Sequence, residues 1–405
     1  MSILLPLVFL ALCALRASAP RGIRLTWSVG WLGLGVAGNI ILYGYAPTQI
    51  STSLGDLNAV WTWGCVVLAL IEGFLAVERN RLGKQATKFL LAYFFFYLLI
   101  LLAAFFSGLE LTLSSLYLIA FFMLILFLGP KNENLDGLRF VGLISMFFIY
   151  YLLLTDYNPM QYSTLGKPIA GMSAPEYRNF VWDIFGLQDR FHGPFSHPNQ
   201  LGMYSAFFST ALATSEKRWY RFFSLGFVIL TFCAASRTSM IVALIGQLLL
   251  QSYKIWGKSM KKQKRFYGYF LLFGVGSVLF VGFQFGSGRS SLFLESFKKY
   301  PIEVIFGTPS FTIENSFLIN LFQLGLIGFL LVFYLHFIPL KIFWNSNLRA
   351  AGIGIVFTIQ LIIASSSEAV VYGSILNPGS LYLLILVILL NSIPDYIDSK
   401  AGQKK

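Results

Sequence analysis

A cluster of polar residues in segment 190–202 stands directly before an apolar run. The segment reads Arg-Phe-His-Gly-Pro-Phe-Ser-His-Pro-Asn-Gln-Leu-Gly, and it brings four side chains to an expected helix start: Arg190, His192, His197 and Asn199. Cationic side chains beside a helix N-terminus can hold an anion, because the backbone N–H groups and the helix dipole favour negative charge there. The competing interpretation is that these residues only start the helix, with Asn199 as the N-cap and Gly193 in the turn before it.

Two further arginines stand among small residues. Arg237 lies in Ala-Ala-Ser-Arg-Thr-Ser, between apolar segments 222–235 and 239–252 that are both short for a membrane crossing. Placing an arginine at the middle of a bilayer costs on the order of 3 kcal/mol, so an arginine drawn into the membrane favours a functional role. The alternative is an arginine at the membrane surface whose side chain extends to the lipid headgroups. Arg289 follows Gly-Ser-Gly. Glycine allows close approach and a guanidinium can bind phosphate through two parallel hydrogen bonds, so Arg289 is a candidate phosphate ligand.

A carboxylate and an amide precede another apolar segment. A Glu314 carboxylate near arginines stays ionised and can accept a proton as a general base, with Asn315 beside it. Helix capping is the alternative role for this pair. Gly325 and Gly328 lie deeper in the same segment and are interpreted as packing residues. No acidic pair in the expected outer loops has Asp-x-Asp spacing, so we expect neither a metal nor a cofactor.

These residues must be positioned by helices in a membrane. The chain of 405 residues is 57% hydrophobic, 17% aromatic and only 12% charged, which excludes an aqueous globular class. We expect an all-α polytopic membrane protein, one domain over residues 1–405, with about twelve or thirteen transmembrane helices. The apolar segments lie within residues 2–15, 28–45, 60–77, 89–107, 111–129, 140–156, 201–214, 222–235, 239–252, 267–285, 316–338, 351–364 and 379–392.

Charge predicts the orientation of these segments. The formal net charge is +13, and most of the 30 Lys and Arg residues fall in alternate loops, the densest being 254–265. Such loops stay cytoplasmic during insertion, which explains the charge without a nucleic-acid partner. The N-terminus is then outside, with a retained first segment. This orientation puts two long connections, 157–200 and 286–315, on the extracytoplasmic side with the candidate residues.

Four elements resemble the O-antigen ligase and polysaccharide polymerase family of bacterial envelopes, in the expected order and over roughly residues 185–335. They are the R-x-x-G-x-F-x-H-P-N-x-L-G stretch at 190–202, the Ser-Arg turn at 235–238, the Gly-Arg pair at 288–289 and the N-x9-G-x-x-G segment at 315–328. The first pattern is fairly specific beside an outer loop, whereas the Ser-Arg and Gly-Arg pairs alone are weak.

The resemblance implies a metal-independent glycosyltransferase without a cofactor, in the bacterial cytoplasmic membrane with its active site on the extracytoplasmic face. It implies transfer of a glycan from a polyprenyl pyrophosphate carrier to an acceptor sugar. Catalysis would fall to Glu314, Arg289 and Arg237, with substrate bound by Arg190, His192, His197, Asn199 and Asn315. The implied partners are the lipid-linked glycan, membrane lipid, a chain-length regulator and a flippase.

Several alternatives stay open. Ligases of the family usually carry His where this chain has Glu314, which favours a polymerase of repeat units over a ligase. A flippase or other secondary transporter would also suit many spans, and it predicts inverted repeats and broken helices. No internal repeat is apparent in the sequence. A scaffolding role leaves Arg237 and Arg289 unexplained.

Overall fold

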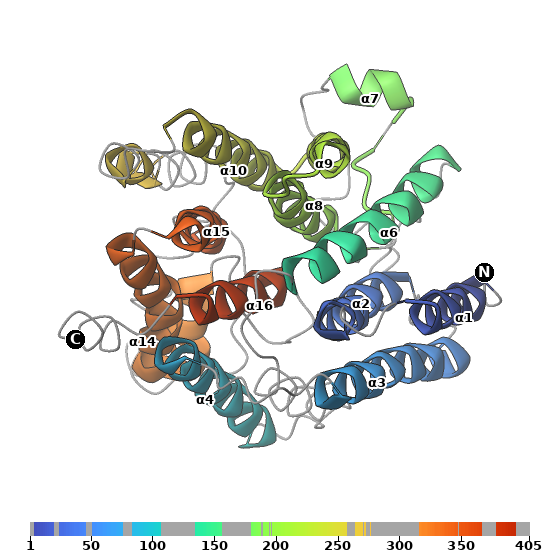
Figure 1. Cartoon of the computed structure of the whole chain (residues 1–405), viewed down its shortest axis with the longest axis horizontal. Coiled ribbons are helices and arrows are strands. Elements are labelled where there is room, and N and C mark those ends of the chain that lie inside the picture. The colour runs from blue at the N-terminus through green and yellow to red at the C-terminus, as the bar shows by residue number, and fades with distance from the viewer. Residues whose placement is uncertain are drawn as a thin grey trace.

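The structure is a computed structural model, and it is a bundle of helices (Figure 1). It describes residues 4–19, 24–45, 51–75, 83–106, 134–155, 180–187, 189–193, 195, 197–256, 264–269, 271–272, 276, 316–346, 348–366 and 378–393. Within these residues there is no β-strand. The expected all-α class is therefore confirmed for the part of the chain that the structure describes.

The helices follow the predicted apolar segments. They are α1 (Leu4–Ala17), α2 (Arg24–Tyr45), α3 (Ser51–Leu75), α4 (Lys84–Phe106), α6 (Asn134–Leu154), α7 (Phe180–Phe185), α8 (Pro198–Ala213), α9 (Arg218–Cys233), α10 (Arg237–Trp256), α14 (Ser316–Asn345), α15 (Arg349–Ser365) and α16 (Pro378–Asn391). The predicted segment 111–129 and most of 267–285 lie outside the described residues. The short helix α7 falls inside the predicted outer loop 157–200.

Three apolar helices form the centre of the bundle. Nearly every residue of α8 and α15 is buried, and the described side chains of α16 are buried as well. The helices α9 and α10 pack on α8, and α14 packs on α15 (Figure 1). The outward-facing side chains are also apolar: Phe74 of α3 is 74% exposed and Phe147 of α6 is 61% exposed. Two of the described helices, Leu135–Leu154 and Ser316–Asn345, are long and apolar enough to cross a membrane.

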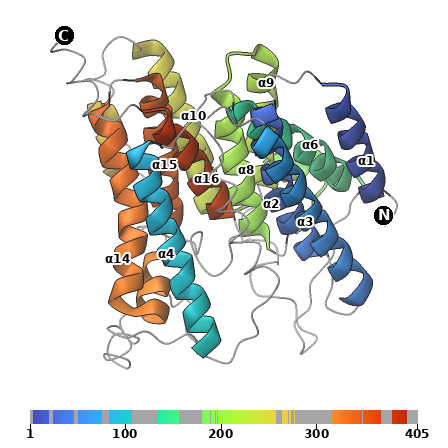
Figure 2. The same ribbon diagram turned by 60° about the horizontal axis from the view of Figure 1, so that its bottom comes forward.

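Polar contacts join helix ends at one end of the bundle, which is uppermost in Figure 2. We call this the basic end. At this end Arg16 pairs with Glu72, whose carboxylate oxygens lie 2.5 and 2.7 Å from the guanidinium. Gly83 donates its backbone N–H to the Asn391 side chain at 2.9 Å. The two contacts join the end of α1 to α3, and the start of α4 to the end of α16.

Helix α14 is folded back on itself. Gly325 adopts φ 67° and ψ −164°, which interrupts the helix, and the rings of Phe317 and His336 have centroids 4.9 Å apart. In one straight helix the same two residues would lie about 28 Å apart at 1.5 Å per residue. A short arm, 316–324, therefore runs back along a long arm, 326–345. The sequence predicts one span at 316–338, and the structure breaks it at Gly325 because only glycine readily adopts this φ.

Glycines allow the two arms of α14 to meet. A Cβ at Gly328 would lie 2.2 Å from the Cβ of Leu324 and 3.0 Å from the Asn320 carbonyl oxygen. The interpretation of Gly328 as a packing residue is thus confirmed, whereas Gly325 bends the chain.

Candidate functional site

The loop before α8 is packed against the end of α9. The backbone N–H of Phe191 donates to the Cys233 carbonyl at 3.0 Å, and the indole Nε1 of Trp182 donates to the Phe232 carbonyl at 3.0 Å. Gly193 forms the predicted turn with φ +51°, and a Cβ there would meet the Phe191 ring at 2.9 Å. These contacts hold loop 187–197 beside the α9–α10 turn, some forty residues later in the sequence.

His197 caps helix α8. Its Nδ1 accepts the backbone N–H of Asn199 at 3.1 Å, its backbone is extended, and Pro198 occupies the first helical position. The alternative with Asn199 as the N-cap is therefore wrong, since Asn199 lies inside the helix. Because Nδ1 accepts this bond, a neutral His197 carries its proton on Nε2.

Arg190 connects two parts of the site. Its Nη2 donates to Oδ1 of Asn199 at 2.7 Å, and its Nε donates to the Ala234 carbonyl at 3.0 Å. Ala234 stands three residues before Arg237. The structure thus brings Arg190 and Asn199 next to the Ser-Arg turn, which sequence distance alone does not require.

The turn between α9 and α10 is strained and well capped. Ala235 has φ 46°, an uncommon value for a residue with a side chain. The hydroxyl of Ser236 accepts the backbone N–H of Ser239 at 3.4 Å and its hydroxyl at 2.8 Å, which is the position of an N-cap acceptor. Arg237 is the first residue of α10 and is half-buried.

Helix α10 is longer than expected. It continues to Trp256, beyond the predicted segment 239–252, because Lys254 is a good helix former although it is charged. Arg237 therefore lies at the end of a helix of 20 residues rather than between two short segments.

The N-terminal part of α8 touches the start of α10. A Cβ at Gly202 would lie 2.4 Å from the hydroxyl oxygen of Ser239 and 3.1 Å from the Cβ of Ser236. Both helices therefore begin in the same region, and each N-terminus carries roughly half a positive charge. Arg190, Arg237 and the two helix starts therefore bring positive charge to this region.

His192 is buried within the loop. It is 2% exposed, and its Nδ1 lies 2.7 Å from the Phe195 carbonyl. Because a carbonyl only accepts, Nδ1 carries the proton. This bond helps to hold the turn between Phe191 and His197, and contact of His192 with substrate stays a prediction.

Three predicted site residues, Arg289, Glu314 and Asn315, lie outside the described residues. The same is true of the predicted outer loop 286–315. The proximity of Arg289 to Arg237 therefore stays a prediction.

A buried histidine in α14 was not identified from the sequence. His336 is fully buried, with Nδ1 2.6 Å from the Val332 carbonyl and Nε2 2.7 Å from the Ser365 hydroxyl. The Ser365 hydroxyl therefore donates to Nε2, while Nδ1 carries the proton. An imidazole inside an apolar run was the available signal, because ionisable groups at such positions are costly.

A second buried polar contact ties three helices together. The Gln360 amide of α15 donates to the Thr210 hydroxyl of α8 at 2.8 Å and to the Val242 carbonyl of α10 at 2.9 Å. Gly246 leaves room for this amide, because a Cβ there would lie 2.2 Å from Nε2 of Gln360. The contact fixes α8 and α10, whose starts form the candidate site.

Among the residues that the structure describes, no group of three or more His, Cys, Asp or Glu side chains could hold a metal ion. A scan against protein-family models, a search of curated proteins and a search of solved structures each found no match.

Proposed function

We propose that the chain is a polytopic integral membrane protein of the bacterial cytoplasmic membrane. Helices α2, α3, α4, α6 and α10 have 20 to 25 residues each, and at 1.5 Å per residue they match a hydrocarbon core of about 30 Å. Large apolar side chains face outward, which soluble monomers avoid over wide areas. Cationic residues gather at the basic end, which favours that end as cytoplasmic.

Within this membrane frame, we propose that the protein polymerises polyprenyl-pyrophosphate-linked oligosaccharide units on the extracytoplasmic face. The observation that carries the proposal is the pair of hydrogen bonds from Arg190 to Asn199 and to the Ala234 carbonyl. They join the two best-described elements of the family resemblance, together with two helix starts. Guanidinium groups and helix N-termini are the groups that bind a diphosphate without a metal.

The proposed reaction is a metal-independent glycosyl transfer. The acceptor hydroxyl oxygen attacks the anomeric carbon of the donor, the bond from that carbon to the diphosphate oxygen breaks, and polyprenyl diphosphate leaves. Arg237 and the predicted Arg289 stabilise the charge that develops on the leaving diphosphate. The hydroxyl proton passes to the carboxylate predicted at Glu314.

The test is an Arg237→Ala variant in the native host, followed by analysis of lipid-linked and surface glycans. We expect single repeat units to be displayed and long polymer to be lost. Arg237→Lys should recover only part of the polymer, because an ammonium lacks the two parallel hydrogen bonds of a guanidinium. Glu314→Gln in the same assay tests the predicted base.

Arg265→Ala is the matched control, since Arg265 is an exposed arginine in the predicted cytoplasmic loop. It should leave polymer length unchanged. Normal polymer in the Arg237→Ala strain, with protein present at wild-type level, would reject the proposal. Long polymer that stays on its carrier would favour the ligase alternative.

A transporter of lipid-linked glycan is the second candidate, and the interruption of α14 at Gly325 favours it, because transporters use broken helices near their binding sites. A transport defect would leave undisplayed units on the inner leaflet. Labelling of lipid-linked glycan from outside the membrane separates this outcome from a polymerase defect.

A further inference from the structure

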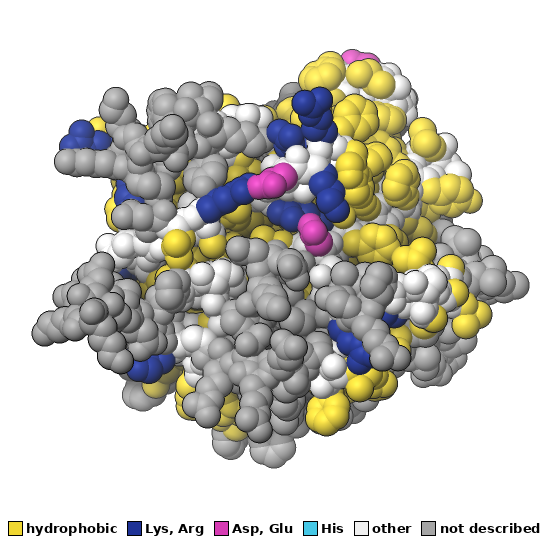
Figure 3. All heavy atoms as spheres, in the orientation of Figure 1, with side chains coloured by type: hydrophobic (Ala, Val, Ile, Leu, Met, Phe, Trp, Pro, Cys, Tyr) yellow, Lys and Arg dark blue, Asp and Glu magenta, His cyan; other side chains and the backbone are white. Residues whose placement is uncertain are grey.

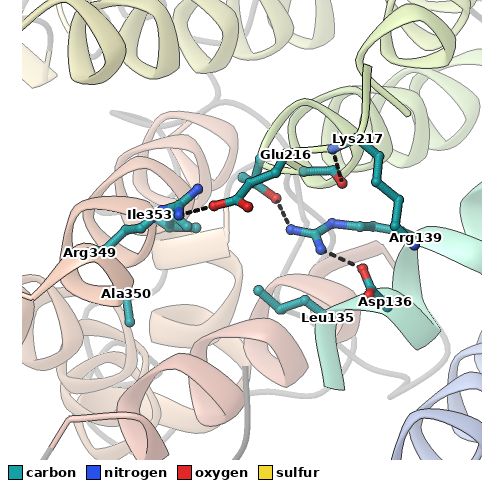
Figure 4. A pocket seen from close by; sticks show the side chains of 10 residues that line it. Leu135, Asp136, Arg139, Glu216, Lys217, Arg349, Ala350 and Ile353 are labelled. Carbon is teal, nitrogen blue, oxygen red and sulfur yellow. Dashed lines mark hydrogen bonds and ion pairs between the residues drawn. The ribbon is translucent and has the colours of Figure 1, made fainter. Parts of the chain in front are cut away.

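A cavity of about 300 Å³ opens at the basic end of the bundle, away from the site described above. It is formed by the start of α6, the α8–α9 connection and the start of α15 (Figure 4). Its charged lining consists of Arg139, Lys217, Arg349, Asp136 and Glu216. Three cations and two carboxylates give a formal sum of +1. We call this cavity the basic pocket.

The two helices that begin at the basic pocket carry positively charged residues at their N-termini, where the helix dipole favours negative charge. Helix α9 begins at Arg218 after Lys217, α15 begins at Arg349, and neither first turn contains an acidic residue. Neither N-cap makes a side-chain capping hydrogen bond. Cations at the positive end of a helix dipole are destabilising, and the first backbone N–H groups need acceptors. A bound anion would offset both costs.

Arg139 makes hydrogen bonds that hold the walls of the pocket together. It donates to Asp136 at 2.6 Å, to the Thr214 hydroxyl at 2.8 Å and to the Ala211 carbonyl at 3.2 Å. These bonds join α6 to the end of α8. Arg139 therefore supplies fixed positive charge and shape, rather than a movable ligand.

The Glu216–Arg349 ion pair can open. The hydrogen bond from Arg349 lowers the pKa of the Glu216 carboxyl, yet the two side chains are 76% and 57% exposed. Exposed pairs contribute little to stability, so exchange of the carboxylate for a phosphate costs little. Arg349 can thus turn to a ligand, and the Lys217 ammonium, 5.8 Å from the centre of the Tyr220 ring, lies on the pocket rim.

An apolar surface continues from Lys217 across α9 to α6. The Tyr220 ring beside Lys217 stacks on Trp219, with centroids 3.7 Å apart, and the Phe223 ring lies 6.2 Å from that of Trp219 and 5.8 Å from that of Phe147. Trp219 is 45% exposed and Phe147 is 61% exposed. Figure 3 shows the Lys and Arg side chains gathered around acidic ones, with an apolar surface beside them. A ligand that matches both features has an anionic head and a hydrocarbon tail.

We propose that the basic pocket binds the headgroup phosphate of an anionic phospholipid, whose acyl chains lie along the apolar surface of Trp219, Phe223 and Phe147. Arg349 and Lys217 contact the phosphate, and the helix starts add their N–H groups. A free phosphate would use the same cations but would leave the apolar surface of Trp219, Phe223 and Phe147 without a role. The inference rests on the proposed membrane topology, which puts the pocket at the cytoplasmic leaflet, and not on glycosyl transfer.

The experiment uses the full chain in neutral detergent, with the thermal unfolding midpoint followed against added ligand. Phosphatidylglycerol should raise the midpoint, whereas phosphatidylcholine and inorganic phosphate should not. The double variant Lys217→Ala/Arg349→Ala should bind phosphatidylglycerol roughly thirtyfold more weakly, from about 1 kcal/mol per cation. Lys341→Ala removes an exposed lysine of α14 outside the pocket and should bind normally.

Equal binding by the double variant, or equal stabilisation by phosphatidylcholine, would overturn the proposal. A matching effect of inorganic phosphate would assign the pocket to a soluble anion instead. If the double variant does not fold, phosphatidylglycerol with a photoreactive headgroup can be cross-linked to the unmodified chain. Labelling within 214–221 and 349–353 is expected, and labelling elsewhere contradicts the site.

The same measurements separate this inference from the proposed function. Loss of lipid binding in wild-type protein, with polymer still dependent on Arg237, rejects the lipid site alone. Specific lipid binding with polymer independent of Arg237 rejects the glycosyltransferase alone.

Discussion

The Arg190 guanidinium donates to Oδ1 of Asn199 at 2.7 Å while its Nε holds the Ala234 carbonyl at 3.0 Å. One side chain therefore fixes the loop before α8 against both the first turn of α8 and the turn before α10. A hydrogen bond from a charged donor contributes about 1.5–3 kcal/mol, so each of these bonds restrains the position of Arg190. Variants of Asn199 can therefore test separately how Arg190 is positioned and how much positive charge the site needs.

Replacing Asn199 should impair the proposed reaction in two different ways. Asn199→Ala removes the acceptor, so Arg190 is no longer held and polymer formation should fall roughly ten- to hundredfold. Asn199→Asp keeps an acceptor but offsets the positive charge, so the KM for the lipid-linked donor should rise while the fold is retained. Purified protein with a lipid-linked oligosaccharide tests both. Wild-type kinetics in both variants would contradict the role of the pair.

A rescue experiment tests the contact between α8 and α10. Gly202→Ala should destabilise the protein by about 1–3 kcal/mol, because the added Cβ would lie 2.4 Å from the Ser239 hydroxyl oxygen. Adding Ser239→Gly removes that atom and should restore part of the stability. Thermal unfolding of the single and double variants gives the coupling energy. Additive effects would show that the two residues are not in contact.

The fold-back of α14 depends on Gly325. Gly325→Ala should cost about 1–3 kcal/mol, since its φ of 67° disfavours a side chain. Gly276→Ala is the control, because nothing lies within 4 Å of a Cβ there and its φ is not positive. In a background without the native cysteines, Phe317→Cys with Phe337→Cys should form a cross-link only if the arms lie side by side. Failure to cross-link, with normal folding, would argue for a straight helix.

The His336–Ser365 pair should behave as a matched polar contact. Ser365→Ala leaves Nε2 of the buried imidazole without its donor and should destabilise the fold by about 1–3 kcal/mol. His336→Phe combined with Ser365→Ala removes both polar partners and should be closer to wild-type stability than Ser365→Ala alone. Unfolding of purified protein measures the difference. A double variant less stable than either single variant would contradict the interpretation.

The Glu216–Arg349 pair predicts a small pH dependence of stability. The folded-state pKa of Glu216 lies below its ordinary value of 4.5 because Arg349 hydrogen-bonds to the carboxylate. The stabilisation is therefore fully present above pH 4.5 and is lost as the pH falls through the lowered pKa. The difference in unfolding midpoint between wild type and Arg349→Ala should vanish at acid pH. Lys341→Ala should show no such trend, and a difference that persists in acid would exclude the pair as its cause.

The sequence predicted the helices of this fold better than their contacts. Apolar runs identified each helix of the described part except α7, because the faces by which helices pack on one another require apolar side chains. The bend at Gly325 could not be derived, since a glycine within an apolar run is equally consistent with close packing. Asn199 was a natural N-cap candidate by residue type, yet His197 takes that position and frees Asn199 for Arg190.

The candidate site was predicted in its composition but not in its connections. The hydrogen bond from Arg190 to Ala234 spans 44 residues, and no local pattern encodes such a pairing. The buried His336 and Gln360 were not identified, because lone polar residues in apolar helices show no spacing. Their partners, Ser365 and Thr210, become evident only when the helices are packed.

The fold-back at Gly325 also has an electrostatic consequence. Antiparallel arms have opposed dipoles, and the amino-terminal end of the short arm lies at Ser316, which is fully buried. That end adds roughly half an elementary positive charge to the interior. Because this charge belongs to the peptide units, a change of pH cannot titrate it away, and straightening the helix would move it rather than remove it.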